Sequence, residues 1–298
     1  MNSKFINWFI LIILGLIWGS SFILMKRGLD VYSSNEVAGL RIFISFLFLS
    51  PLIYRHVKKK LWKHWKSFLG MGMFGNFIPA FLFTKAETGI SSSLAGILNS
   101  LTPLFTLLLG VIIFKARTRL VNVIGLILGF VGAVGMMTVG KNVDIGNNLV
   151  YGSYILLATV FYGLSVNIVK SKLGAVNSVT ATVWAMMFIG PLAGIYVFGF
   201  TDFTTRFSTN VNALHSLGYI CLLAIFGTAI SVILFNILIK NTTTLFASSV
   251  TYLIPIVAMG WGVVDGDSIY LFHFVWIALI LFGVYLVNKK KASKILPE

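Results

Sequence analysis

The chain has 298 residues, of which 58% are hydrophobic and only 10% are charged, and its net charge is +15. A soluble domain carries about 25% charged residues to cover its surface, so this composition excludes a water-soluble globular protein. A helix that crosses the hydrocarbon core needs about 20 apolar residues, which the apolar stretches supply, whereas barrel strands would alternate over about 10. We therefore expect an all-α membrane protein whose surrounding partner is the lipid bilayer.

The apolar segments predict ten transmembrane helices with mostly short connections. In chain order the expected spans are 8–27, 35–54, 67–87, 94–114, 120–140, 149–169, 178–199, 216–238, 245–264 and 270–288. The first is expected as an uncleaved span, because no small-residue cleavage site follows it before the next apolar segment. No separate soluble domain fits between the spans.

Basic residues predict the orientation, since lysine and arginine stay on the cytoplasmic side. With the N-terminus inside, the cytoplasmic segments hold most of the 23 basic residues, including the cluster from Arg55 to Lys66. All but one of the eight acidic residues then fall outside or at outer helix ends. This predicts an N-in/C-in topology, in which the charge of +15 is a topology signal and not a nucleic-acid-binding surface.

The sequence also repeats itself. Residues 18–26 resemble residues 162–170 in an aromatic-Gly pair, a serine and a terminal lysine, at an offset of 144. The further matches have an offset of 152. They pair Gly75 with Gly227, Asn76 with Thr228, Phe83 with Phe235, Ala95 with Ala247, and Pro103 with Pro255.

These matches predict two five-helix repeats, residues 1–144 and 145–298. An odd number of spans turns the second repeat upside down relative to the first. Inverted repeats of this kind are common in secondary transporters, where two similar halves surround a site near the midplane of the membrane.

At these residues the chain resembles the EamA-type carriers of the drug/metabolite transporter superfamily along nearly its whole length. The resemblance lies in residues 16–22, 40–42, 91–95 and 101–105 and in the doubled five-span layout. It implies a bundle that functions as a monomer in a bacterial inner membrane, with a central cavity lined chiefly by helices one, three, four, six, eight and nine. It also implies substrates such as amino acids and related metabolites, usually exported. The chain departs from the family where residues 114–117 lack an acid that the second half retains at Asp267.

Polar groups within spans are costly against lipid and therefore mark candidate substrate contacts. The predicted substrate-binding residues are Trp18, Ser21, Asn76, Asn99, Tyr162, Thr228, Thr251 and Tyr252. The alternative for each is packing, because small and polar side chains also hold membrane helices together. No metal-ligand or cofactor motif accompanies them, and the single cysteine, Cys221, excludes a disulfide framework.

Three further residues have predicted roles within the spans. Pro103 and Pro255 each remove a backbone hydrogen bond in mid-span, which predicts either a static kink or a gating hinge. Arg41 lies about 9 Å below the outer surface at 1.5 Å per residue. Its long side chain serves either as a structural anchor that reaches the surface or as an electrostatic group near the substrate path.

The leading functional hypothesis is a metabolite exporter that works by alternating access. An uptake permease of the same fold and a non-transporting membrane scaffold are the alternatives. Enzymatic catalysis is not expected, because the spans contain neither a metalloprotease motif nor a nucleophile turn. The acids and histidines lie in loops or near helix ends, so we expect a facilitator that does not couple transport to protons.

Overall fold

The computed structural model describes residues 3–90, 92–138, 149–264 and 270–288. Within these ranges the secondary structure is helical and contains no strand. Six helical stretches there are long and apolar enough to cross a membrane, and shorter apolar helices accompany them. The chain is therefore a helical integral membrane protein. Asp267 and the C-terminal lysines, which entered the predictions above, lie outside the described residues.

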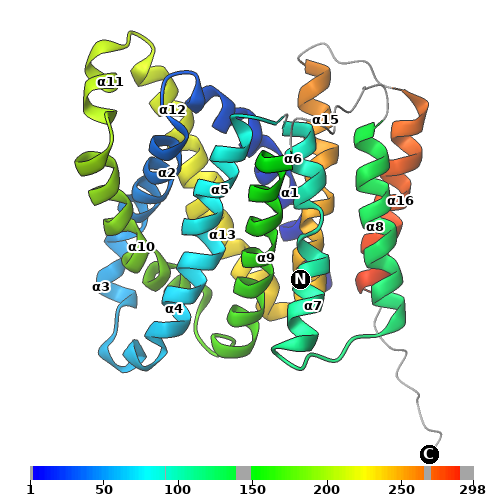
Figure 1. Cartoon of the computed structure of the whole chain (residues 1–298). Helices are drawn as coiled ribbons and strands as arrows, with labels where there is room; N and C mark the ends of the chain where they lie inside the picture. The colour runs from blue at the N-terminus through cyan, green and yellow to red at the C-terminus, as the bar shows by residue number, and fades with distance from the viewer. Residues whose placement is uncertain (1–2, 91, 139–148, 265–269, 289–298) are drawn as a thin grey trace, which may run out of the picture.

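Figure 1 shows the helices of the described residues in chain order. Residues 3–138 form α1 (Ser3–Leu29), α2 (Ser34–Leu49), α3 (Ile53–His56), α4 (Trp65–Gly72), α5 (Ile78–Glu87), α6 (Ser92–Asn99), α7 (Thr102–Ile112) and α8 (Leu120–Thr138). Residues 149–288 form α9 (Leu149–Lys172), α10 (Ser178–Phe200), α11 (Phe203–Thr209), α12 (Ala213–Ala224), α13 (Ser231–Asn241), α14 (Thr244–Ser248), α15 (Ile254–Val264) and α16 (Leu271–Asn288). Each predicted span contains helical structure over its described residues, and the number of ten membrane crossings stays a prediction.

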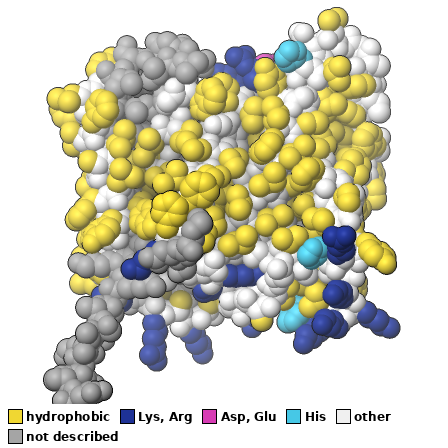
Figure 2. Space-filling model, turned by 180° about the vertical axis from the view of Figure 1, so that it is seen from behind, with side chains coloured by type: hydrophobic (Ala, Val, Ile, Leu, Met, Phe, Trp, Pro, Cys, Tyr) yellow, Lys and Arg dark blue, Asp and Glu magenta, His cyan; other side chains and the backbone are white. Residues whose placement is uncertain are grey.

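Hydrophobic side chains cover the middle of the face seen in Figure 2, while most of the lysine and arginine side chains visible there gather at one end. Exposed leucine, isoleucine and phenylalanine side chains along the helices would be unfavourable in water, and lipid is the solvent that suits them. The clustering of basic side chains at one end is the pattern expected of a cytoplasmic face.

Local sequence signals define several helix starts. Ser33 and Glu36 form a capping box at the start of α2, with a distance of 2.7 Å from the Ser33 backbone nitrogen to Glu36 Oε2. Glu36 also pairs with Arg206 of α11 at 3.4 Å. Burial raises the pKa of nearby Tyr32, and Glu36 raises it further, so the phenol stays protonated and donates to the Ala213 carbonyl. These contacts join the α1–α2 connection to α11 and α12.

The helices of the two predicted halves are interleaved in space. The first helix, α1, packs against α12, α13 and α15, whereas α9 packs against α4, α5, α6 and α7. In the same way, α2 packs along α10. The last pair, α8 and α16, lies side by side at one edge of the bundle (Figure 1). The centre of the bundle is therefore walled by helices from both halves.

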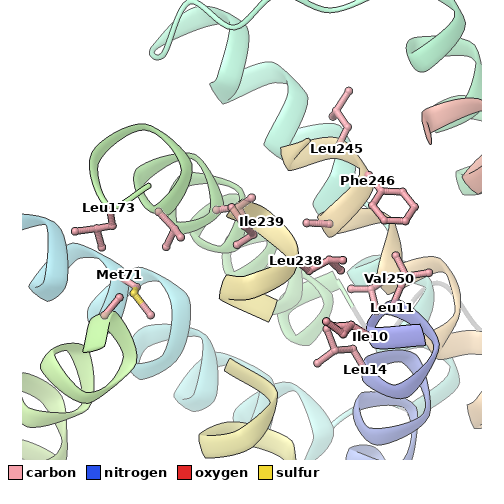
Figure 3. Close-up of a cluster of buried hydrophobic side chains, with 14 of the residues drawn as sticks. Ile10, Leu11, Leu14, Met71, Leu173, Leu238, Ile239, Leu245, Phe246 and Val250 are labelled. Carbon is pink, nitrogen blue, oxygen red and sulfur yellow. The ribbon is translucent and has the colours of Figure 1, made fainter. Parts of the chain in front are cut away.

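The largest buried cluster of the described residues draws its side chains from helices of both halves. Figure 3 shows Leu11 of α1, Leu238 of α13 and Val250 lying side by side, with Met71 and Ile239 in the same cluster. Branched aliphatic side chains of this kind pack densely and exclude water. Two of its members, Leu238 and Ile239, directly precede Lys240 of α13.

Two of the long helices contain a π-helical turn. It covers Met73–Phe77 between α4 and α5, and Ile225–Ile230 between α12 and α13. Such turns insert one extra residue and frequently occur at functional sites. The two turns contain Asn76 and Thr228, which the sequence repeat pairs at an offset of 152.

Two predicted spans, 94–114 and 245–264, differ from continuous helices. The first is interrupted between α6 and α7, and the second passes from α14 through a 3-10 segment, Ser249–Tyr252, to α15. Pro103 and Pro255 occupy the first turns of α7 and α15. Proline is tolerated there because that turn needs no backbone N–H donor. The two prolines thus lie at interruptions of these helices, and the Asn99 carbonyl, four residues before Pro103, accepts from Thr102 Oγ1.

Candidate functional site

A cavity of about 120 Å³ lies at the centre of the bundle, between α1, α2, the π-turns, α9, α13 and the interrupted helices. An apolar cavity of about 150 Å³ in another protein binds benzene, so this space suits a small molecule. Seven of the residues singled out from the sequence line it. They are Trp18, Ser21, Arg41, Asn76, Asn99, Tyr162 and Thr251.

Arg41 contributes the cavity's charge. Its Nε donates to Thr228 Oγ1 at 2.6 Å, and one terminal nitrogen lies 3.4 Å from the Gly227 carbonyl oxygen. Tyr162 lines the same cavity. The Arg41 side chain therefore turns into the bundle toward the second π-turn. Whether Arg41 serves as a structural anchor or as an electrostatic group near the substrate path stays a prediction.

Aromatic side chains wall the cavity in a crossed arrangement. Trp18 of α1 packs edge-on against Phe235 of α13 at 5.0 Å, and its indole N–H donates to the Gly227 carbonyl. Tyr162 of α9 packs against Phe83 of α5 at 5.8 Å. Trp18 pairs with Tyr162 in the sequence repeat, and Phe83 pairs with Phe235. Each aromatic of one half thus contacts the matched phenylalanine of the other half.

Two glycines allow a similarly crossed close approach. A methyl group placed on Gly227 would lie 2.9 Å from Ser21 Oγ, and one placed on Gly75 would lie 2.4 Å from Ser165 Oγ. Gly75 and Gly227 are matched in the repeat, as are Ser21 and Ser165. Glycine is therefore required where α1 and α9 cross the π-turns.

Amide and hydroxyl groups supply the remaining polar surface. Asn76 is buried and makes no side-chain hydrogen bond to the residues that the structure describes, so its amide is available to a ligand. Asn99 accepts from Thr102 Oγ1 through both its backbone carbonyl, at 2.7 Å, and its side-chain oxygen, at 3.2 Å. Asn236 of α13 also lines the cavity and donates to Thr182 at 2.9 Å.

Tyr252 was predicted to contact substrate, but it does not line the cavity. Its hydroxyl donates to the Leu126 carbonyl at 2.8 Å, and its ring lies against Gly129 of α8. The reason is the 3-10 segment, in which side chains repeat every three residues. Ser248, Thr251 and Ile254 therefore face the cavity, and Tyr252 turns toward α8. Thr228 lies one layer behind the lining, as the partner of Arg41.

Other lining residues were missed in the sequence, chiefly Asn236, Met71, Phe22 and Phe83. Phe83 carried a usable signal, because it pairs with Phe235 in the repeat. Asn236 carried a weaker one, as an amide within an apolar span. Met71 carried none, since methionine is common in any apolar helix.

Lysine contacts join α9 to α13 next to the lining residues Val169 and Ile239. Lys170, at the end of α9, donates to the carbonyls of Ile239, Lys240 and Thr242 at 2.9, 3.0 and 2.6 Å. Lys240 in turn donates to the Val176 carbonyl. Lys26 matches Lys170 in the repeat, yet it is exposed and makes no hydrogen bond or ion pair within the described part of the chain. The matched lysines therefore differ in their contacts, because Lys170 joins two helices and Lys26 does not.

Comparison with known families identifies the architecture. The family model of EamA-like transporters matches residues 6–138 and again residues 151–289. The chain belongs to the EamA-like transporter family. This confirms the resemblance that was read from the first, second and fourth spans.

Individual relatives of this EamA-family chain span nearly its full length. The uncharacterized inner membrane transporter YedA of Escherichia coli (strain K12) is 26% identical over 93% of this chain and 88% of its own. A Salmonella typhimurium protein named "Probable amino-acid metabolite efflux pump" is also 26% identical, over 93% of each chain. A crystal structure of another protein superposes with a TM-score of 0.72 at 16% identity, covering 96% of each chain, and shows that the fold is shared.

Proposed function

We propose that this EamA-family protein is a secondary transporter that exports small metabolites, amino acids among them, by alternating access. The observation that carries the proposal is the central cavity, which is walled by crossed residue pairs from both halves of the chain. Transporter sites lie near the membrane midplane at such repeat interfaces, often at interrupted helices. Here α6–α7 and α14–α15 are interrupted beside the cavity.

The proposed topology is ten spans in two inverted repeats, residues 1–144 and 145–298, with both termini in the cytoplasm. The matched π-turns, prolines and aromatic pairs support the repeats. The gathering of lysine and arginine side chains at one end of the bundle supports the orientation.

We propose that alternating access arises when the two matched halves exchange their contacts. In the described state, Lys170 ties α9 to the end of α13, and the aliphatic cluster of Figure 3 lies nearby. In the alternate state, we propose that the matched Lys26 ties α1 to the end of α5 while the Lys170 contacts open. Matched halves that exchange their contacts give two states around one site.

Export of metabolites is proposed from the efflux-pump name of the Salmonella relative, at 26% identity. The bacterial inner membrane is proposed as the location from YedA, and one chain encloses the whole cavity, which supports a monomeric unit. The lining contains no aspartate, glutamate or histidine among the described residues, which supports facilitated transport without proton coupling. Glu36 is engaged in its capping box and ion pair, away from the lining.

The test is a resistance and flux experiment. Cells that express the chain are challenged with toxic amino acids and analogues, and any compound that gives resistance is then followed in proteoliposomes. Export with no dependence on an imposed pH gradient is the expected result. If no compound gives resistance and none moves in proteoliposomes, the proposal is wrong and the alternative of a non-transporting membrane scaffold is favoured.

A further inference from the structure

Arg41 leaves the cavity with an uncompensated positive charge. It is the one charged side chain among the described lining residues, and the described residues supply no acidic partner for it. Its two contacts are a hydroxyl and a carbonyl, both neutral. A charge removed from water is unfavourable unless it is paired, so a substrate that supplies the counter-charge gains the energy of that pairing.

The guanidinium also retains unused donors. It carries five N–H groups in a planar fork, and the contacts to Thr228 and Gly227 account for two. The remaining donors belong to a side chain that lines the cavity. A guanidinium fork matches the two oxygens of a carboxylate, with charge-assisted hydrogen bonds that are about twice as strong as neutral ones.

Among the described lining residues, no anionic side chain offers a binding partner for a cation. The polar groups are amides and hydroxyls such as Asn76, Asn99 and Ser165, and the walls are aromatic or aliphatic. An ammonium group would find no carboxylate there among the described residues. The site therefore distinguishes the two charged ends of an amino acid: it balances the carboxylate and tolerates, without requiring, the amine.

We infer that the cavity binds small carboxylate-bearing substrates through Arg41, and that the substrate's amino group is dispensable. A monoanion balances the single charge of Arg41, and a cavity of about 120 Å³ limits the skeleton to a few carbon atoms. Oxo acids and hydroxy acids are then substrates of the same cavity, while amines and amides of the same skeleton are not. This inference rests on the proposed transport function.

The test uses four compounds of one skeleton with the full-length chain in proteoliposomes. Valine and 3-methyl-2-oxobutanoate carry the carboxylate, whereas valinamide and isobutylamine lack it. Labelled flux is measured for each, and stabilisation of the detergent-purified protein against thermal unfolding is measured in parallel. Both acids should move and stabilise the protein, and the two compounds without a carboxylate should move at least about tenfold more slowly, as expected for the loss of a hydrogen-bonded ion pair.

Variants separate recognition from folding. Arg41→Gln should lower the flux of both acids at least about tenfold and bring the ratio of valine to valinamide flux close to one, because the charge that distinguishes them is gone. Arg41→Lys keeps the charge but not the fork, and should retain part of the preference. Arg117→Gln, which removes an exposed arginine outside the lining, is the matched control and should behave like wild type.

Equal flux of valine and valinamide in the wild-type protein would overturn the inference while leaving transport established. An acid preference that persists in a folded Arg41→Gln variant would also overturn it. If neither acid moves or stabilises the protein, the inference is wrong, and the proposed transport function is judged separately by the resistance screen, which includes compounds without a carboxylate. Should Arg41→Gln fail to fold, the four-compound series in the wild-type protein decides the question.

Discussion

The Nε of Arg41 lies 2.6 Å from Thr228 Oγ1, so a charged group of α2 is held by a hydroxyl on the second π-turn. This contact connects residues 187 positions apart in the chain. It aims the guanidinium at the cavity and away from the surface of the bundle, and it therefore fixes where the cavity's charge lies.

Replacing Thr228 with valine keeps the shape of the side chain but removes the acceptor. A charged donor that loses its partner in a buried setting costs about 1–3 kcal/mol, so Thr228→Val should unfold at a lower temperature and transport more slowly. Thr228→Ser keeps the hydroxyl and should resemble wild type in both measurements. Equal behaviour of the valine and serine variants would show that the hydrogen bond does not position Arg41.

A second prediction concerns the place where α9 crosses the first π-turn. Gly75→Ala places a methyl group 2.4 Å from Ser165 Oγ, which forces α9 away from the π-turn and should lower both stability and flux. Adding Ser165→Ala removes the hydroxyl, after which the nearest atom is a Cβ at 3.2 Å, so the double variant should recover much of the loss.

The matched control for Gly75 is Gly218, since a methyl group there would meet nothing within 4 Å. Gly218→Ala lies within α12 and should be neutral or stabilising by about 0.5–1 kcal/mol, because alanine favours the helix. The test is the thermal unfolding of the wild-type protein, Gly75→Ala, the double variant and Gly218→Ala. A double variant no more stable than Gly75→Ala would contradict the assigned close contact.

Much of the fold could be predicted from the sequence because lipid imposes simple rules. The length of the apolar stretches predicted the helical segments. The repeat matched Trp18 with Tyr162 and Phe83 with Phe235, but it did not predict that Trp18 packs against Phe235 and Tyr162 against Phe83. The family assignment was likewise predictable. The two-repeat organisation and the orientation remain predictions.

The candidate site was less predictable, because local backbone geometry decides which side chains face inward. Period-3.6 counting failed at Tyr252, where a 3-10 segment turns the ring toward α8. It also failed to include Asn236, which reaches the cavity from α13 beyond a π-turn. Pro103 and Pro255 mark the interruptions in the sequence, but no residue type marks the π-turns or the 3-10 segment in the same way.

The lysine contacts at the end of α9 predict a shift between states. Lys170→Met removes three hydrogen bonds to the end of α13 and its connection to α14, so we expect α9 and α13 to separate there more often. A cysteine at Val169, which lines the cavity near that end, should then react faster with a thiol reagent applied from the side where the basic residues gather. Lys172→Met, two residues away and exposed, is the control and should leave the rate unchanged. An unchanged rate in Lys170→Met would mean that these contacts do not hold α9 and α13 together.

The central claim is that one cavity becomes accessible from each side of the membrane in turn. The direct measurement labels single cysteines at Asn99 and Thr251, in a Cys221→Ser background, with a membrane-impermeant thiol reagent applied to vesicles of either orientation. Tyr252→Cys serves as the comparison, because that side chain is packed against α8. We predict labelling at Asn99 and Thr251 from both sides, protection by a transported substrate, and little labelling at Tyr252. If neither cavity position is labelled from one of the two sides, the account is contradicted.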